Sequence, residues 1–214
     1  MELTNQPSEI LPIFPLNAVI FPDAMLPLHI FEERYKILIC ECLAEGKEFG
    51  INLIHEQKIR SIGCTVIVSS SEKKYDDGTM DIVVKGRRRY TLLALLESPH
   101  PYHIGKISYY DDIKEEPNDE LLKHAITLYN RFVKIAFKGM VPQAQRKPQK
   151  SITSFFLVQK SGLELIQRQL FLSMDSENKR LEFLVQHYES LLPIIIVKQK
   201  FEEIIMNDGY LQEL

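Results

Sequence analysis

Hydrophobic residues in the first 110 positions follow the short, interrupted pattern that is typical of β-strands. The most apolar segment, residues 11–31, contains prolines at positions 12, 15, 22 and 27. Because proline cannot donate a hydrogen bond to a neighbouring strand, this segment predicts short strands, edges or bulges. Further strands are predicted at residues 49–55, 62–70, 79–85, 87–96 and 102–109. So many short strands in about 100 residues indicate a closed or nearly closed barrel.

One helix is expected to interrupt these strands. From Glu32 onward, apolar residues recur with a helical period of 3.6, at Tyr35, Leu38, Ile39, Cys42 and Leu43. Gly46 follows and favours the end of this helix, because glycine readily takes the left-handed conformation that terminates helices. Farther along, Asp77-Gly78 predicts a tight turn between two strands.

The pattern becomes helical after Tyr110. Residues 111–120 are acidic and mark a boundary, and either Asn118 or Asp119 is suited to cap a helix that runs to about Lys138.

More helices are expected at 151–159, 163–172 and 176–207, with a kink or break at Pro193. The chain is therefore predicted to be an α+β protein, with a β-rich subdomain at residues 1–115 and a helical subdomain at residues 116–214.

The composition is that of an ordinary globular protein, with 45% hydrophobic and 26% charged residues and a net charge of −3. The longest apolar runs span seven residues, whereas a membrane-spanning helix needs about 20. The three cysteines fit a reducing compartment, and the N-terminus lacks the pattern of a signal peptide. We therefore expect a cytoplasmic protein with no membrane partner.

The sequence contains no recognisable catalytic motif. It lacks a phosphate-binding loop, a dinucleotide-binding glycine pattern and a nucleophile elbow. His100 and His103 could hold a metal only with Glu97 as a further ligand, which is too few ligands for a convincing site. The sequence thus predicts no enzyme activity, no cofactor and no metal.

A basic stretch gives the main electrostatic signal. Residues 121–163 contain no Asp or Glu but eight basic residues. On a helix these side chains form either an ordinary solvated face or a stripe that binds an anionic partner such as RNA. The candidate polyanion-binding residues are Lys123, Arg131, Lys134, Lys138, Arg146, Lys147 and Lys150.

The segment LPIFPLNAVIFPDAMLPLHIFEERY, residues 11–35, resembles the opening of the Lon protease N-terminal domain. Further matching pieces follow in order at residues 49–51, 77–82, 86–90 and 102–112, and the resemblance extends to about residue 207. It implies a PUA-like β-barrel with one inserted helix, followed by a C-terminal helical bundle. Within the motif, Phe14, Phe21, Leu28 and Phe31 are expected to fill the core.

The resemblance also implies a function. Lon proteases carry an ATPase module and a Ser–Lys peptidase domain, and this sequence resembles neither, so it looks like a stand-alone bacterial substrate-binding domain. We expect a non-enzymatic polypeptide-binding module or adaptor in proteolysis or quality control, with unfolded polypeptide or a protease as its partner. Exposed apolar side chains in a groove between barrel and helices would bind the polypeptide, with Tyr109, Tyr110, Phe155 and Phe156 as candidates. The oligomeric state is left open.

Overall fold

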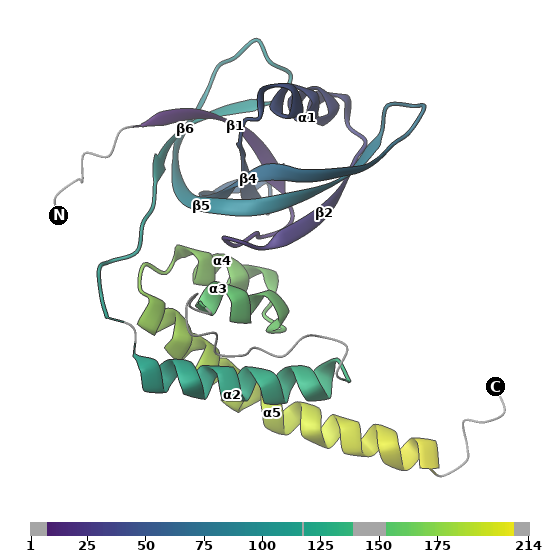
Figure 1. The fold of residues 1–214 in the computed structure, drawn as a ribbon, viewed down its shortest axis with the longest axis vertical. Helices are drawn as coiled ribbons and strands as arrows, with labels where there is room; N and C mark the ends of the chain where they lie inside the picture. The colour runs from purple at the N-terminus through teal and green to yellow at the C-terminus, as the bar shows by residue number, and fades with distance from the viewer. Residues whose placement is uncertain (1–7, 117, 139–152, 208–214) are drawn as a thin grey trace. The chain divides into compact units, whose positions relative to one another are not determined.

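The computed structural model describes residues 8–116, 118–138 and 153–207 (Figure 1). It divides into two compact units. The first contains the residues up to Ile113 together with Glu164–Asp175, and the second contains Lys114–Leu163 and the residues from Ser176 onward. All strands lie in the first unit, and the chain is an α+β protein with a sheet of six strands and five α-helices in its described part.

Six strands form one sheet in the first unit. They are β1 (Glu9–Leu16), β2 (Met25–Ile30), β3 (Phe49–His55), β4 (Lys58–Lys74), β5 (Met80–Leu96) and β6 (His103–Tyr109). The sheet order is β2-β5-β4-β3-β1-β6, and β6 also pairs with β5. The pairings β5-β4-β3-β1-β6 therefore close into a ring, to which β2 is added along β5 (Figure 1).

The predicted strands at 79–85 and 87–96 are one continuous strand, β5, which contains a bulge. Opposite it on β4, Cys64 pairs with Arg89 and Val66 pairs with Gly86, so that Arg87 and Arg88 are inserted between the two pairs. A bulge turns neighbouring side chains away from strict alternation. Arg87 and Arg88 are both exposed as a result, whereas Arg89 is buried.

The core of this unit contains most, but not all, of the predicted motif residues. Phe14 and Phe21 are buried and Leu28 is half-buried, but Phe31 is 63% exposed, so its predicted place in the core was wrong. Phe31 follows the last residue of β2, where its side chain lies beside the exposed ring of His29. An apolar pattern cannot show that a strand ends one residue earlier.

Helix α1 (Glu33–Glu45) confirms the predicted helix, although Leu43, one of the apolar positions in its pattern, is 45% exposed. Its buried residues are Tyr35, Leu38, Ile39 and Cys42. Tyr35 stacks on Phe14 of β1 with 4.0 Å between ring centroids, which packs the helix against the strand ring. Gly46 ends the helix in the left-handed conformation, at φ +64°.

A second helix, α4 (Leu165–Ser173), belongs to the first unit, whereas the predicted division at residue 115 assigned it to the helical part. Phe171 packs edge-on against Phe21, with 5.8 Å between ring centroids. The guanidinium group of Arg89 donates to the carbonyl oxygens of Leu172 (2.9 Å) and Met174 (2.6 Å). These bonds satisfy carbonyls that a helix end leaves without partners.

The second unit contains α2 (Asp119–Ala136), α3 (Ser154–Leu157), a short 3₁₀ turn η1 (Val158–Lys160) and α5 (Glu177–Asn207). Asn118 caps α2, as expected, by accepting hydrogen bonds from the backbone of Glu120 and Leu121. Helix α5 is continuous and includes Pro193. Of the predicted kink or break at that proline, the break is therefore absent from the described helix.

Helices α2, α3 and α5 pack around aromatic rings and one buried ionic cluster. Tyr188 of α5 lies 5.3 Å from the Phe132 ring of α2, between centroids. Arg180 is almost fully buried and donates to the Ser154 hydroxyl (2.9 Å) and to the Glu177 carboxylate (2.7 Å). This cluster fixes α3 on the first turn of α5.

Candidate functional site

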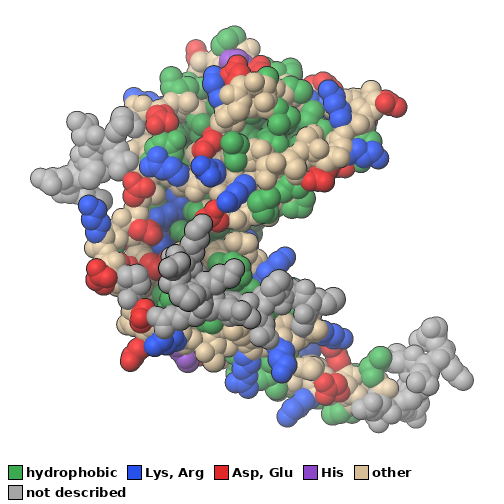
Figure 2. Space-filling view, in the orientation of Figure 1, with side chains coloured by type: hydrophobic (Ala, Val, Ile, Leu, Met, Phe, Trp, Pro, Cys, Tyr) green, Lys and Arg blue, Asp and Glu red, His purple; other side chains and the backbone are tan. Residues whose placement is uncertain are grey.

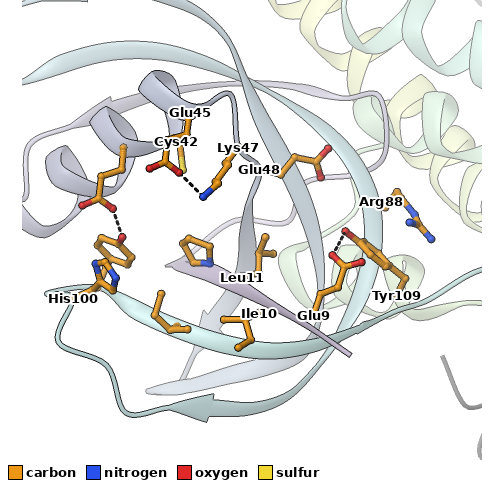
Figure 3. Close-up of a pocket in the computed structure, with 14 residues that line it drawn as sticks. Glu9, Ile10, Leu11, Cys42, Glu45, Lys47, Glu48, Arg88, His100 and Tyr109 are labelled. Atoms are coloured by element: carbon orange, nitrogen blue, oxygen red, sulfur yellow. Dashed lines mark hydrogen bonds and ion pairs between the residues drawn. The ribbon is translucent and has the colours of Figure 1, made fainter. Parts of the chain in front are cut away.

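A hollow of about 700 Å³ lies on the first unit, beside the N-terminal half of β1 (Figure 3). We call it the β1 hollow. It is lined by residues 9–12 of β1, by Glu41, Cys42, Glu45, Lys47 and Glu48 around the end of α1, by Arg88, and by His100, Tyr102, Ile104 and Tyr109. It therefore combines aliphatic surface with several charged groups.

One wall of the β1 hollow is a strand edge. Residues 9–13 of β1 pair with β6, and residues 13–16 pair with β3. In the described part of the chain, no strand pairs with the second edge of residues 9–12. Ile10 in this segment is 69% exposed. An open edge offers backbone groups to an added strand, although Pro12 contributes only its carbonyl oxygen.

Two tyrosine hydroxyl groups donate to carboxylates among the residues that line the β1 hollow. Tyr102 donates to Glu41, and Tyr109 donates to Glu9 over 3.2 Å. Burial raises the pKa of both tyrosines, and the neighbouring carboxylates raise these pKa values further. Both hydroxyl groups are thus protonated at neutral pH and serve as hydrogen-bond donors.

The cysteine in the β1 hollow is not an activated nucleophile. Burial, with Glu41 and Glu45 nearby, raises the pKa of the Cys42 thiol to about 11. A thiolate is the reactive form of cysteine, so this thiol is inert at neutral pH. The arrangement is suited to binding by hydrogen bonds, charge and apolar contact.

The charge of the β1 hollow is mainly negative. Four carboxylates (Glu9, Glu41, Glu45 and Glu48) line it, against the two cations Lys47 and Arg88. Both cations have partners. Lys47 forms an ion pair with Glu45, and Arg88 lies over the Tyr109 ring at 3.7 Å and near Asp111 at 3.6 Å. A basic ligand is therefore favoured over an acidic one.

The predicted aromatic residues lie in different environments within their units. Tyr109 lines the β1 hollow, while the Tyr110 hydroxyl donates to the Ser173 carbonyl oxygen over 2.6 Å and so holds the end of α4. In the second unit, Phe155 is buried beneath Arg180, and Phe156 is 40% exposed. Of the four, Phe155 is buried, Tyr109 and Tyr110 are half-buried, and Phe156 is exposed.

The basic residues of the predicted stripe are partly described. Lys123, Arg131 and Lys134 are exposed on α2. Lys138 is exposed beyond the end of α2, with a left-handed φ of +48°, so it does not continue the helical arc. Arg146, Lys147 and Lys150 lie outside the described residues.

Sequence reasoning missed most of the β1 hollow. Glu41 and Glu45 lie one helical turn apart on the polar face of α1, a spacing that the sequence shows. The pairing of β1 with β6 brings Tyr102 and Tyr109 to the β1 hollow. The sequence pattern does not reveal which strands pair.

In the described residues, no group of three His, Cys, Asp or Glu side chains is placed to hold a metal ion. His100 stacks on the Tyr102 ring, with 4.9 Å between centroids. None of the described helices is long and apolar enough to cross a membrane.

Comparison with known proteins identifies the family. Residues 10–190 match the ATP-dependent protease La (LON) substrate-binding domain. Lon protease of Syntrophus aciditrophicus is 27% identical over 67% of this chain and 20% of its own length, and Lon protease of Escherichia coli K12 is 24% identical over 89% and 26%. The chain thus spans about a quarter or less of these curated relatives.

Two solved structures are similar in fold. The Lon N-terminal domain protein from Xanthomonas campestris has a TM-score of 0.65 and 25% identity, covering 83% of this chain and 98% of its own. The N-terminal domain of Mycobacterium avium complex Lon protease has a TM-score of 0.64 and 16% identity, covering 85% and 98%. Since the family match spans most of the sequence, the chain belongs to the ATP-dependent protease La (LON) substrate-binding domain family.

Proposed function

We propose that this protein is a non-enzymatic module that binds extended polypeptide at the β1 hollow, as an adaptor or recognition protein in proteolysis or quality control. The observation that carries the proposal is the open edge of residues 9–12, which forms a wall of this hollow and presents the exposed Ile10. An extended peptide added to such an edge gains main-chain hydrogen bonds, and pockets beside the strand select its side chains.

Family membership supports a substrate-binding role in proteolysis. The chemistry of the β1 hollow supports binding without catalysis, because its one thiol is protonated and its tyrosines are hydrogen-bond donors. The closed ring of strand pairings supports a PUA-like barrel, and the packing of α2 on α5 supports a helical bundle. The three free cysteines support a reducing, cytoplasmic location.

The ligand class follows from the lining. Four carboxylates favour a peptide with basic side chains, and Ile10, Leu11 and Ile104 favour aliphatic ones. Tyr109 contributes an aromatic face at one end, with Arg88 stacked on it. We therefore propose unfolded segments that alternate aliphatic and basic residues as the preferred class.

The test is fluorescence anisotropy with labelled peptides of this class. Ile10→Asp is expected to weaken binding by about tenfold or more, because it replaces an apolar contact with a charged group that a bound aliphatic side chain would desolvate. Met25→Asp is the matched control, since Met25 is also an exposed hydrophobic residue on a strand of the same unit and lies outside the hollow. Equal binding by wild type and Ile10→Asp would place the peptide elsewhere.

Two control peptides separate the contributions of charge and backbone. Replacing the basic residues with glutamate should abolish binding, and this difference should shrink in high salt. Replacing alternate residues with proline should also weaken binding, because proline cannot donate to the edge of β1.

A second candidate function is weak binding of RNA or another polyanion by the basic stretch. The observation that favours it is the exposure of Lys123, Arg131 and Lys134 on α2, none of which forms an ion pair within the described residues. A salt titration of RNA binding compares wild type with Arg131→Glu/Lys134→Glu/Lys138→Glu. The triple variant should lose binding if these cations contact phosphates, and unchanged binding at low salt would exclude the stripe.

A further inference from the structure

The last turns of α5 carry a hydrophobic stripe that the second unit leaves exposed. Beyond Pro193, the exposed large hydrophobic residues include Ile194, Val197, Phe201, Ile204 and Ile205. At 100° per residue, these five fall within an arc of about 100°. Ile194, Val197, Phe201 and Ile204 also follow the alternating three- and four-residue spacing of a helix that pairs with another helix.

This part of α5 projects past the end of α2 (Figure 1). Figure 2 shows hydrophobic, basic and acidic side chains close together on these turns. Phe201 is 62% exposed and Ile194 is 65% exposed, values that are unusual for large side chains arranged in one stripe. The five residues therefore form one continuous hydrophobic surface rather than isolated exposed side chains.

The flanking charges identify the partner. Lys198 and Lys200 precede Phe201 and lie on the two sides of the stripe, while Glu202 and Glu203 follow it. The segment is thus basic before its central phenylalanine and acidic after it. A helix of the same sequence running in the opposite direction presents glutamates where this one presents lysines.

We propose that two copies of this chain associate through an antiparallel pair of α5 helices, related by a two-fold axis at Phe201. The two Phe201 rings meet at the centre, with Val197 and Ile204 of each copy on either side. Lys198 then lies near Glu202 of the second copy on one flank, and Lys200 lies on the other flank. A parallel pair in register instead brings Lys198 and Lys200 of the two copies to the same side, which is repulsive.

Self-pairing of this kind is isologous, because the same surface is used by both copies and the assembly closes as a dimer. The pair covers the hydrophobic stripe and uses none of the residues of the β1 hollow. The dimer proposal therefore goes beyond the proposed polypeptide binding, and either proposal can be wrong without the other.

Sedimentation equilibrium of the full chain between about 10 and about 500 µM tests the proposal. The wild type should shift from monomer to dimer over this range, and a protein that stays monomeric throughout would overturn the proposal. Phe201→Glu should weaken dimerisation at least tenfold. Met206→Glu is the matched control, because Met206 is equally exposed but lies on the opposite side of the helix, and it should leave dimerisation unchanged.

Charge reversal tests the direction of pairing. Lys198→Glu should weaken the dimer at low salt, since this position then faces Glu202 of the second copy. Adding Glu202→Lys to that variant exchanges the two signs and should restore the dimer to within about threefold of wild type. A Lys198→Glu variant that dimerises as well as wild type, or a double variant without rescue, would contradict the antiparallel arrangement.

Discussion

The hydroxyl group of Tyr90 donates a hydrogen bond to the side-chain oxygen of Asn52 inside the strand ring, where both residues are fully buried. The Asn52 amide nitrogen in turn donates to the Arg60 carbonyl oxygen over 2.9 Å. The ring of Tyr90 crosses Gly50 so closely that a β-carbon at this position would clash with the Tyr90 hydroxyl oxygen. The glycine therefore makes room for the polar pair.

Gly50→Ala is expected to destabilise the protein by about 1–3 kcal/mol, because the added methyl group overpacks the core against Tyr90. Urea unfolding monitored by circular dichroism measures this cost. In a Tyr90→Leu background the same substitution should cost less, since the clashing ring is gone. An equal cost in both backgrounds would show that Tyr90 is not the neighbour that excludes the side chain.

Arg89→Lys is expected to lower the free energy of unfolding by about 2–4 kcal/mol. A lysine cannot donate at once to the carbonyl oxygens of Leu172 and Met174 and to Asp112, so buried acceptors lose their partners. Hydrogen exchange should show α4 losing protection first.

Arg88→Lys is the control for that measurement, because Arg88 is the exposed neighbour in the same bulge. It should change stability by about 0.5 kcal/mol or less. Equal effects of the two substitutions would contradict the role assigned to Arg89.

In the second unit, Arg180→Ala is expected to lower the free energy of unfolding by about 3–5 kcal/mol. The substitution leaves the carboxylate of Glu177 without its buried cation and creates a cavity beside Phe155. Glu182→Ala, at an exposed position on the same helix, should be close to neutral. Thermal unfolding of the two variants beside wild type measures the difference, and similar melting temperatures would refute it.

Alkaline pH should weaken the fold through its buried thiols. Burial raises the pKa of Cys42 to about 11 and that of Cys64 to about 12, above the pKa that each has in an unfolded chain. Above pH 9 the unfolded state releases these protons first, so stability is complete below pH 9 and falls as the pH rises towards 12. Urea unfolding at several pH values should show this decline, and a flat profile from pH 8 to 11 would contradict it.

Native alkylation provides a second measure of the same environment. At pH 8, iodoacetamide should modify the exposed Cys40 while Cys42 and Cys64 remain unmodified, as read by peptide mass spectrometry. Rapid modification of Cys42 at that pH would show a reactive thiol in the β1 hollow and would reopen the question of catalysis.

The sequence predicted the elements well where one local rule decides them. The period of α1, its end at Gly46 and the Asn118 cap are all local patterns, and all three are confirmed. Its resemblance to Lon N-terminal domains is confirmed as well. The predicted burial of Phe31 was wrong, because the end of a strand depends on packing elsewhere in the fold.

The candidate site was harder to predict. Tyr109 was selected from the sequence and does line the β1 hollow, but the carboxylates of the hollow come from β1, from α1 and from Glu48 just before β3. They meet only because β1 pairs with β6 over residues 9–13 and leaves its other edge open. Strand register is a property of the whole sheet, so the sequence pattern alone could not reveal this edge.

Hydrogen exchange with and without a saturating aliphatic and basic peptide tests the central claim most directly. Amides of residues 9–11 and of 41–48 should exchange more slowly in the complex, because an added strand covers the edge of β1 and fills the β1 hollow. Pro12 has no backbone N–H group and therefore gives no exchange signal. Unchanged exchange in both segments at saturation, with protection confined to other parts of the chain, would contradict binding at this site.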